Sequence, residues 1–317
     1  MKQDLFALDE TYSTTRLITL QKPVIENNPG DKFKTMLFLP ETEDRKGEGG
    51  LRTQGYFKKS LLGKPLITVI TVVFNGEKYL EETIQSVINQ TYDNVEYIII
   101  DGASTDGTLD IIKKYAGQID YWVSEPDGGI YAAMNKGIDV ATGEWINFMN
   151  AGDHFYVDMT IKNIFMVNKR KYDLLYGDCE VLYDGFSRSQ KSVLLDRLWK
   201  RIIFSHQSMF IKADIQKRNQ YNILNQIGAD FELIFKLKDN GNIFCYINEK
   251  VSIVRAEGLS DTKRFGSIKS NWKTEKRYNS RLFVDIYYSY AILDSLLRMI
   301  SKRVLPKWMT EKIIKLK

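Results

Sequence analysis

Residues 65–108 read PLITVITVVFNGEKYLEETIQSVINQTYDNVEYIIIDGASTDGT, and their pattern is the strongest indication of the fold. It begins with a continuous run of β-branched residues, which is typical of a strand buried on both faces of a sheet. An Asn-Gly pair then turns the chain, and apolar residues recur at helical spacing between Leu80 and Ile88. A second apolar run at 95–100 predicts another strand. The stretch therefore predicts a strand, a helix and a second strand in succession.

The same alternation continues toward residue 153. Apolar runs at 119–123 and 144–149 predict two more strands, and the residues at 131–141 between them have helical spacing. Strand and helix thus alternate four times within roughly 90 residues, as in doubly wound proteins. The pattern predicts an α/β fold with a mostly parallel sheet flanked by helices.

Beyond residue 153 the alternation loosens. A tract from about Ser267 to Ile300 has helical spacing of apolar and aromatic residues and predicts one long helix, which Pro306 ends. We also expect helices near 158–168, 195–204 and 230–240, a hairpin turn at 183–186, a strand at 206–211 and a short basic helix at 307–317.

The composition excludes several classes of protein. With 317 residues, 44% hydrophobic and 27% charged, the chain is typical of a globular enzyme, and a net charge of +5 does not imply nucleic acid binding. Cys179 and Cys245 lack metal-ligand spacing and suit a reducing compartment. The start of the chain lacks the apolar core of a secretory signal, and no apolar run is long enough to span a membrane. We expect a cytoplasmic protein.

Three acidic patches follow predicted strands and carry Asp101, Asp127 and Asp153. In an open parallel sheet, the loops after the strands gather at one edge, where ligands bind. Carboxylates gathered at that edge suit a metal-bound nucleotide better than a bare anion.

These residues resemble a known family. The stretch 65–108 strongly resembles the opening of glycosyltransferase family 2, the inverting enzymes with a GT-A fold. The stretch 125–153, EPDGGIYAAMNKGIDVATGEWINFMNAGD, extends the resemblance, in particular to bacterial enzymes that build surface polysaccharides such as O-antigen, capsule and exopolysaccharide. The resemblance covers about residues 65–260. It implies transfer of a hexosyl or N-acetylhexosaminyl group from a nucleoside diphosphate sugar, expected to be a UDP-sugar, to a glycan acceptor on a lipid carrier.

The resemblance does not cover residues 1–64. Their short apolar segments and the charged, Gly-rich stretch near 41–50 predict an N-terminal extension that packs on the domain or contacts a partner, with a flexible stretch near 41–50. The resemblance implies a GT-A domain at 65–260 with a nucleotide-binding half at 65–153 and an acceptor half at 154–260, and a basic helical segment follows at 261–317.

A divalent cation is expected from the chemistry, because sugar transfer expels a diphosphate and Mg²⁺ or Mn²⁺ compensates its charge. The family supplies the metal contact from an Asp-x-Asp-like turn after the fourth strand. Here the turn reads MNAGD, so Asn150 and Gly152 replace acids, and Asp153 remains as the metal ligand. Asn150 can offer an amide oxygen to a ligand or ribose. The alternative for Asp153 is a helix or turn cap.

The resemblance places the donor around the first two strands. Asp101 would accept the ring N–H of the base, and Phe74 and Asn75 would contact base and ribose. The alternatives are an Asx-turn for Asp101 and the core for Phe74. Asp106 is expected to cap the following helix.

Asp127 belongs to a loop that the family places beside the donor sugar or ribose. The family's usual arginine near the diphosphate falls at Met134, and Lys136 would take over its charge. Ala132 stands where related enzymes often have Asp, which removes one sugar contact.

An inverting displacement needs a general base for the acceptor hydroxyl. The family places an Asp at the start of a helix, and IGADFELIFKL at 227–237 matches this segment with Asp230 as the base. Glu232 is a weaker candidate, and the alternative for Asp230 is a carboxylate favoured by the helix dipole. His206, in FSHQSMF, is either a phosphate or acceptor contact or a core histidine, whereas Arg201 is either an acceptor contact or a solvated charge.

The C-terminal end is strongly basic, with seven Lys or Arg residues and one acid between 298 and 317. It is either a solvated helical end or a peripheral anchor on the inner face of an anionic membrane. The aromatic stripe of the preceding helical tract either pairs two chains or is core.

Two other functions remain open. The first is a non-catalytic nucleotide-sugar-binding or scaffold protein with a degenerate GT-A site, suggested by Asn150, Gly152 and Ala132. The second is a sugar nucleotidyltransferase, which would require a Gly-rich basic loop after the first strand that FNGEKY does not supply.

Overall fold

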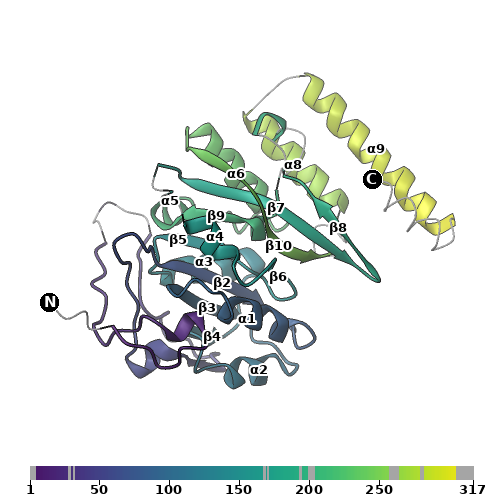
Figure 1. Cartoon of the computed structure of the whole chain (residues 1–317). Helices are drawn as coiled ribbons and strands as arrows, with labels where there is room; N and C mark the ends of the chain where they lie inside the picture. The colour runs from purple at the N-terminus through teal and green to yellow at the C-terminus, as the bar shows by residue number, and fades with distance from the viewer. Residues whose placement is uncertain are drawn as a thin grey trace.

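The structure is a computed structural model, and it describes residues 5–27, 30, 33–166, 169, 171–192, 195–198, 204–256, 264–278 and 282–304. One large sheet runs through this part of the chain, with the order β1-β4-β3-β2-β5-β9-β7-β10-β6 and with β8 paired to β7. Figure 1 shows helices on both faces of the sheet. This arrangement confirms the predicted doubly wound architecture.

The centre of the sheet consists of four parallel strands. β2 (Ile67–Val73) pairs with β3 (Val95–Asp101) on one side and with β5 (Trp145–Phe148) on the other, and β3 pairs with β4 (Tyr121–Ser124). Every residue of β2 and β3 is buried, which explains why their sequences are mostly apolar and do not alternate between apolar and polar residues.

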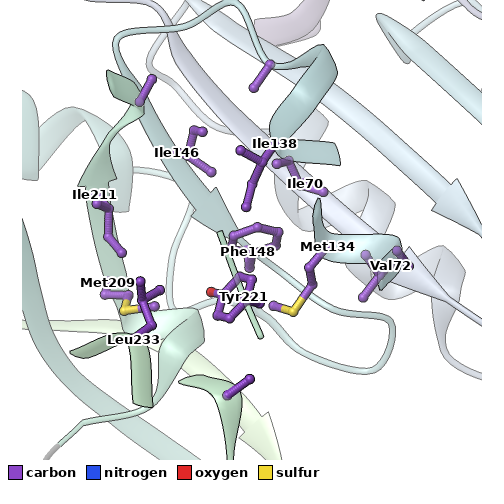
Figure 2. Packing of buried hydrophobic residues seen from close by; sticks show 14 of the residues in the cluster. Ile70, Val72, Met134, Ile138, Ile146, Phe148, Met209, Ile211, Tyr221 and Leu233 are labelled. Carbon is purple, nitrogen blue, oxygen red and sulfur yellow. The ribbon is translucent and has the colours of Figure 1, made fainter. Parts of the chain in front are cut away.

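Helices connect these strands and cover both faces. They are α1 (Leu80–Ile88), α2 (Thr108–Lys114) and α3 (Ile130–Val140). Since alternate residues of a strand point to opposite faces, β2 contributes to two cores. Its residues Ile70 and Val72 pack against Met134 and Ile138 of α3, as Figure 2 shows, while its other apolar residues pack with α1.

The second half of the sheet is mixed. β9 (Met209–Lys212) runs antiparallel to β5 and joins it to β7 (Leu174–Tyr183), and β7 and β8 (Phe186–Gln190) form the predicted hairpin. The remaining elements here are β6 (His154–Phe155), α4 (Thr160–Phe165), η3 (Leu195–Arg197), η4 (His206–Ser208), α5 (Ala213–Arg218), α6 (Ala229–Asp239) and β10 (Phe244–Arg255).

The N-terminal extension lies along the β4 edge of the sheet, as the purple segment of Figure 1 shows. It contains η1 (Ser13–Thr15), β1 (Gly47–Gly49) and η2 (Leu51–Gln54). The expectation of a flexible stretch near 41–50 is therefore wrong, because β1 pairs antiparallel with β4. Further along, the guanidinium of Arg52 lies 2.5 Å from a carboxylate oxygen of Glu96, and both side chains are buried.

The C-terminal tract also differs from the prediction of one long helix. It consists of α8 (Arg264–Tyr278) and α9 (Leu282–Val304), and the rings of Trp272 and Tyr288 stack between the two helices. In the region 195–204, the described backbone forms only the short η3 turn, and residues 199–203 lie outside the described part, as does the basic helix expected at 307–317. None of the helices described here has the combination of length and hydropathy needed to cross a membrane.

Candidate functional site

The candidate site lies at the carboxyl ends of the parallel strands. β2, β3, β4 and β5 end at Val73, Asp101, Ser124 and Phe148, and their parallel pairing places these ends at one edge of the sheet. The loops that follow carry the predicted acidic residues. The structure thus confirms that the three acidic patches gather along one edge.

Asp101 is fully buried at the end of β3. One carboxylate oxygen accepts a hydrogen bond from the Ser124 hydroxyl at 2.6 Å, and the carboxylate also accepts the backbone N–H and the hydroxyl of Ser104. The Ser104 hydroxyl oxygen in turn accepts the N–H of Asn75 at 2.7 Å. Asp101 therefore organises the loop after β3 and joins it to the loop after β2.

The loop after β2 presents an aromatic ring to solvent. Phe74 is 66% exposed, so it does not belong to the core. Asn75 adopts a left-handed backbone with φ 52°, and its side-chain oxygen accepts the N–H of Thr105 at 2.8 Å. Phe74 is thus held beside the loop that follows Asp101, where a base could stack on its ring.

Asp127 lies against the same loop. A Cβ added to Gly102 would lie 2.8 Å from a carboxylate oxygen of Asp127, so a larger residue here would displace the Asp127 side chain. The other oxygen accepts the N–H of Gly129 at 2.7 Å. Burial raises the pKa of Asp127, which is consistent with an acid enclosed between two loops.

Lys136 is engaged within the protein. Its ammonium donates to a carboxylate oxygen of Glu125 at 2.7 Å and to the Pro126 carbonyl at 3.1 Å. Its positive charge is therefore paired with Glu125, in the segment that precedes Asp127. Asp106 behaves as predicted, since its carboxylate accepts the N–H of Thr108 at the start of α2.

Asp153 is nearly buried in the turn after β5, with 8% of its surface exposed. One oxygen accepts the backbone N–H of Arg255 at 3.0 Å, and the other accepts the side-chain amide of Gln207. Burial raises the pKa of Asp153 to about 6, although these two hydrogen bonds oppose the change.

A chain of polar side chains joins the Asn150 turn to α6. The Asn150 amide nitrogen lies 2.9 Å from Nε2 of His206, and Nδ1 of His206 lies 3.8 Å from a carboxylate oxygen of Asp230. The other oxygen of Asp230 accepts the hydroxyl of Tyr131 at 3.1 Å. Residues that are distant in sequence are thus brought together.

The protonation states of His206 and Tyr131 follow from their burial. Burial lowers the pKa of His206, although Asp230 opposes the shift, so the imidazole is neutral near neutral pH. Burial also raises the pKa of Tyr131, so its hydroxyl keeps its proton and can donate a hydrogen bond to Asp230. If Asn150 donates to Nε2, the His206 proton sits on Nδ1 and points toward Asp230.

Of the remaining predicted residues, Glu232 has other partners. Glu232 accepts hydrogen bonds from Asn222, Asn225 and Arg277, so its partners are the loop before α6 and helix α8. Although burial alone would raise the pKa of Glu232, these bonds lower it. Arg201 lies outside the described residues.

Tyr131, Gln207 and Arg255 were missed as contacts of the predicted acids. Gln207 had a signal, because it directly follows His206 in the His-Gln element. Tyr131 and Arg255 had none, because their contacts depend on packing between elements that are far apart in the sequence.

The donor atoms of this turn fit a divalent cation. The described residues contain no group of three or more His, Cys, Asp or Glu side chains that could enclose a metal. However, the amide oxygen of Asn150 is buried and has no hydrogen-bond partner among the described residues, and Asp153 follows Asn150 by three positions in the sequence. An amide and a carboxylate oxygen are ligands that Mg²⁺ and Mn²⁺ accept when phosphate oxygens and waters complete the shell.

The chain is similar in sequence to known proteins. Residues 68–235 match Glycosyl transferase family 2. A PGL/p-HBAD biosynthesis glycosyltransferase of Mycobacterium bovis is 29% identical over 228 residues, which is 70% of this chain and 85% of the relative. The putative teichuronic acid biosynthesis glycosyltransferase TuaG of Bacillus subtilis is 31% identical over 162 residues, which is 48% of this chain and 64% of the relative.

Solved structures show the same fold. The mannosyltransferase PcManGT from Pyrobaculum calidifontis, in complex with GDP-Man and Mn²⁺, has a TM-score of 0.56 and 18% identity, with 80% of this chain and 81% of that chain covered. TarS 1–349 of S. aureus in complex with UDP has a TM-score of 0.52 and 18% identity. The match covers 66% of this chain and just under two thirds of the TarS fragment, 65%. The two likenesses show a GT-A fold.

Proposed function

The chain belongs to glycosyl transferase family 2, and we propose that it transfers a sugar from a nucleoside diphosphate sugar to a glycan acceptor with inversion of configuration. The observation that carries this proposal is the position of His206, which links the Asn150 turn to Asp230. In a single displacement, the leaving diphosphate and the attacking hydroxyl lie on opposite sides of the anomeric carbon. The Asn150 turn, proposed to hold the cation near the diphosphate, and the Asp230 carboxylate, proposed to face the hydroxyl, are connected through His206. This arrangement fits the requirement.

Asp230 is the proposed general base. The acceptor oxygen forms a bond to the anomeric carbon while the bond to the diphosphate breaks, and the hydroxyl proton passes to the Asp230 carboxylate. The Tyr131 hydroxyl holds one carboxylate oxygen at 3.1 Å. The second oxygen faces the neutral His206 ring at 3.8 Å, which is too long for a hydrogen bond and leaves that oxygen able to accept the proton.

Asn150 and Asp153 would hold Mg²⁺ or Mn²⁺. When bound, the cation compensates the charge of the leaving diphosphate. Gln207 and the Arg255 N–H hold the Asp153 carboxylate in place. Asp101, Phe74, Asn75 and Asp127 line the two loops proposed to take the nucleotide and the sugar, and Lys136 supports the second loop through Glu125.

The donor is proposed to be a UDP-sugar, and the acceptor a surface glycan on a lipid carrier. Two relatives are named for PGL/p-HBAD biosynthesis and for teichuronic acid biosynthesis, and one structural neighbour has UDP bound. The basic residues after 298 support a peripheral position on the inner face of an anionic membrane. Cosedimentation with anionic and with neutral vesicles tests this position.

The activity is tested with a panel of UDP- and GDP-sugars, Mn²⁺ and lipid-linked acceptors, by following release of the nucleoside diphosphate. We expect turnover with at least one donor, and loss of turnover in Asp153→Asn and in Asp230→Asn. Asp239→Asn, an exposed acid at the other end of α6, is the matched control and keeps full activity. Full activity of Asp153→Asn and Asp230→Asn would show that the site is elsewhere.

A second candidate function follows from Asn150, which stands where the family has an acid. A protein with this turn could bind a nucleotide sugar without turning it over. Tight nucleotide binding with no release of diphosphate across the whole donor and acceptor panel would favour this non-catalytic role.

A further inference from the structure

The segment 42–49 of the N-terminal extension lies against the two loops proposed to hold the donor. It precedes the residues that match the family, which begin at 68. Its strand β1 pairs with β4, and the backbone N–H of Lys46 donates to the Ser124 carbonyl at 2.8 Å. The segment therefore reaches the carboxyl end of the sheet, where the candidate site lies.

Lys46 holds the first of these loops. Its ammonium donates to the Ala103 carbonyl at 3.0 Å and to the Ser104 carbonyl at 3.0 Å. Ala103 has φ 62°, which is a left-handed conformation that a non-glycine residue adopts at a cost. A cation on two successive carbonyls stabilises this conformation, and the same turn presents Ser104 to Asp101.

Arg45 holds the second loop from the neighbouring position in the chain. Its guanidinium lies 2.8 Å from a carboxylate oxygen of Glu125, which also accepts the hydroxyl of Thr42 at 3.0 Å. The other Glu125 oxygen accepts the ammonium of Lys136. Since Glu125 is buried two residues before Asp127, the contacts fix the start of the Asp127 loop. The dipeptide Arg45-Lys46 thus spans both loops.

We propose that Lys46 is a donor-positioning residue, which sets the loop after β3 for a nucleoside diphosphate and acts through Ala103 and Ser104. This inference rests on the proposed function. A loop that is already ordered loses less conformational entropy when a ligand binds. Removal of the Lys46 ammonium, which orders this loop, therefore weakens binding without changing the chemical step. Lys46 itself is exposed, and its replacement leaves the buried core intact.

The test compares Lys46→Ala, Lys46→Arg and Lys64→Ala with the wild-type chain. Lys64 is the matched control, because it belongs to the same extension but forms an exposed ion pair with Asp93. Affinity for UDP and for GDP is measured calorimetrically with Mn²⁺, together with hydrogen exchange of the Ser104 and Thr105 amides and with the melting temperature. For Lys46→Ala we expect affinity to fall about tenfold, KM for the donor to rise, kcat to stay within about twofold and both amides to exchange faster.

The conservative variant Lys46→Arg is expected to restore affinity and amide protection, and Lys64→Ala is expected to match the wild type. If the wild type binds UDP or GDP and Lys46→Ala binds it equally well, the role of Lys46 is refuted while the proposed function stands. If the wild type binds neither nucleotide, the proposed function fails, and this inference fails with it. A fall in kcat with unchanged KM would also refute a positioning role.

Discussion

His206 and Asp230 face each other across 3.8 Å, between Nδ1 of the ring and a carboxylate oxygen. The opposite ring nitrogen contacts the Asn150 amide at 2.9 Å. One imidazole therefore joins the turn proposed to hold the cation and the carboxylate proposed to take the proton. Because burial lowers the pKa of His206, the ring bridges these groups without adding a positive charge.

Replacement of Asp230 by Asn is expected to lower kcat by about 1,000-fold, because the amide cannot take the acceptor proton. Binding of the nucleoside diphosphate should remain, since the side-chain contacts of Asp230 within the described part of the chain are with Tyr131 and His206, outside the nucleotide loops. Steady-state kinetics and calorimetry measure the two effects. Glu232→Gln, two residues further along α6, is the control and should keep kcat within about threefold. The assignment of the base fails if Glu232→Gln loses more activity than Asp230→Asn.

His206→Gln is expected to lower kcat by about 10- to 100-fold with little change in KM, because the ring positions Asp230 and Asn150 without contacting the acceptor proton. His206→Asn, whose side chain is shorter, should lower kcat by at least as much. Kinetics of both variants over pH 6 to 9 tests this. A purely structural role for His206 would instead lower the melting temperature and raise KM, while kcat per folded molecule would stay unchanged.

Arg52→Met should reduce the free energy of unfolding by about 3–5 kcal/mol, because the substitution leaves the buried carboxylate of Glu96 without its cation. The two side chains are 3% and 2% exposed, and Glu96 is on β3 in the middle of the sheet. Urea unfolding measures the change. Lys64→Met, which removes an exposed pair with Asp93, should cost less than about 1 kcal/mol. Equal losses of unfolding free energy in Arg52→Met and Lys64→Met would mean that the extension does not contribute to the stability of the core.

Lys217 predicts a dependence of stability on pH. Its ammonium donates to the Ala141 carbonyl at 2.7 Å, and burial lowers its pKa to about 8. Between about pH 8 and 10.5, the unfolded chain keeps a proton that the folded chain has lost, so the free energy of unfolding rises with pH. Denaturant unfolding at pH 7, 8, 9 and 9.5 should show this rise in the wild type and a smaller one in Lys217→Met. Identical slopes would assign the pH dependence to other groups.

Much of the fold could be predicted from the sequence because its central strands are buried on both faces. A strand such as β2 has seven consecutive buried residues and needs no tertiary information to be recognised. The same reasoning failed for residues 41–50, because β1 is a short polar strand that exists only through its pairing with β4. It failed again for the C-terminal tract, where the stacking of Trp272 on Tyr288 shows two helices packed against each other instead of one.

The edge at which the three acidic loops gather could be predicted from the sequence alone, since parallel strands bring their carboxyl ends together whatever the details of packing. The sequence placed Asp101, Asp127 and Asp153 at that edge and Asp230 at the start of its helix. How these residues are connected follows only from the packing of the folded chain. Tyr131 and His206 contact Asp230, Asn150 contacts His206, and Lys46 reaches the loop after β3, through contacts between residues 24 to 99 positions apart. Such contacts depend on the packing of whole elements, because no local pattern of residues specifies which distant side chains will come within hydrogen-bond distance.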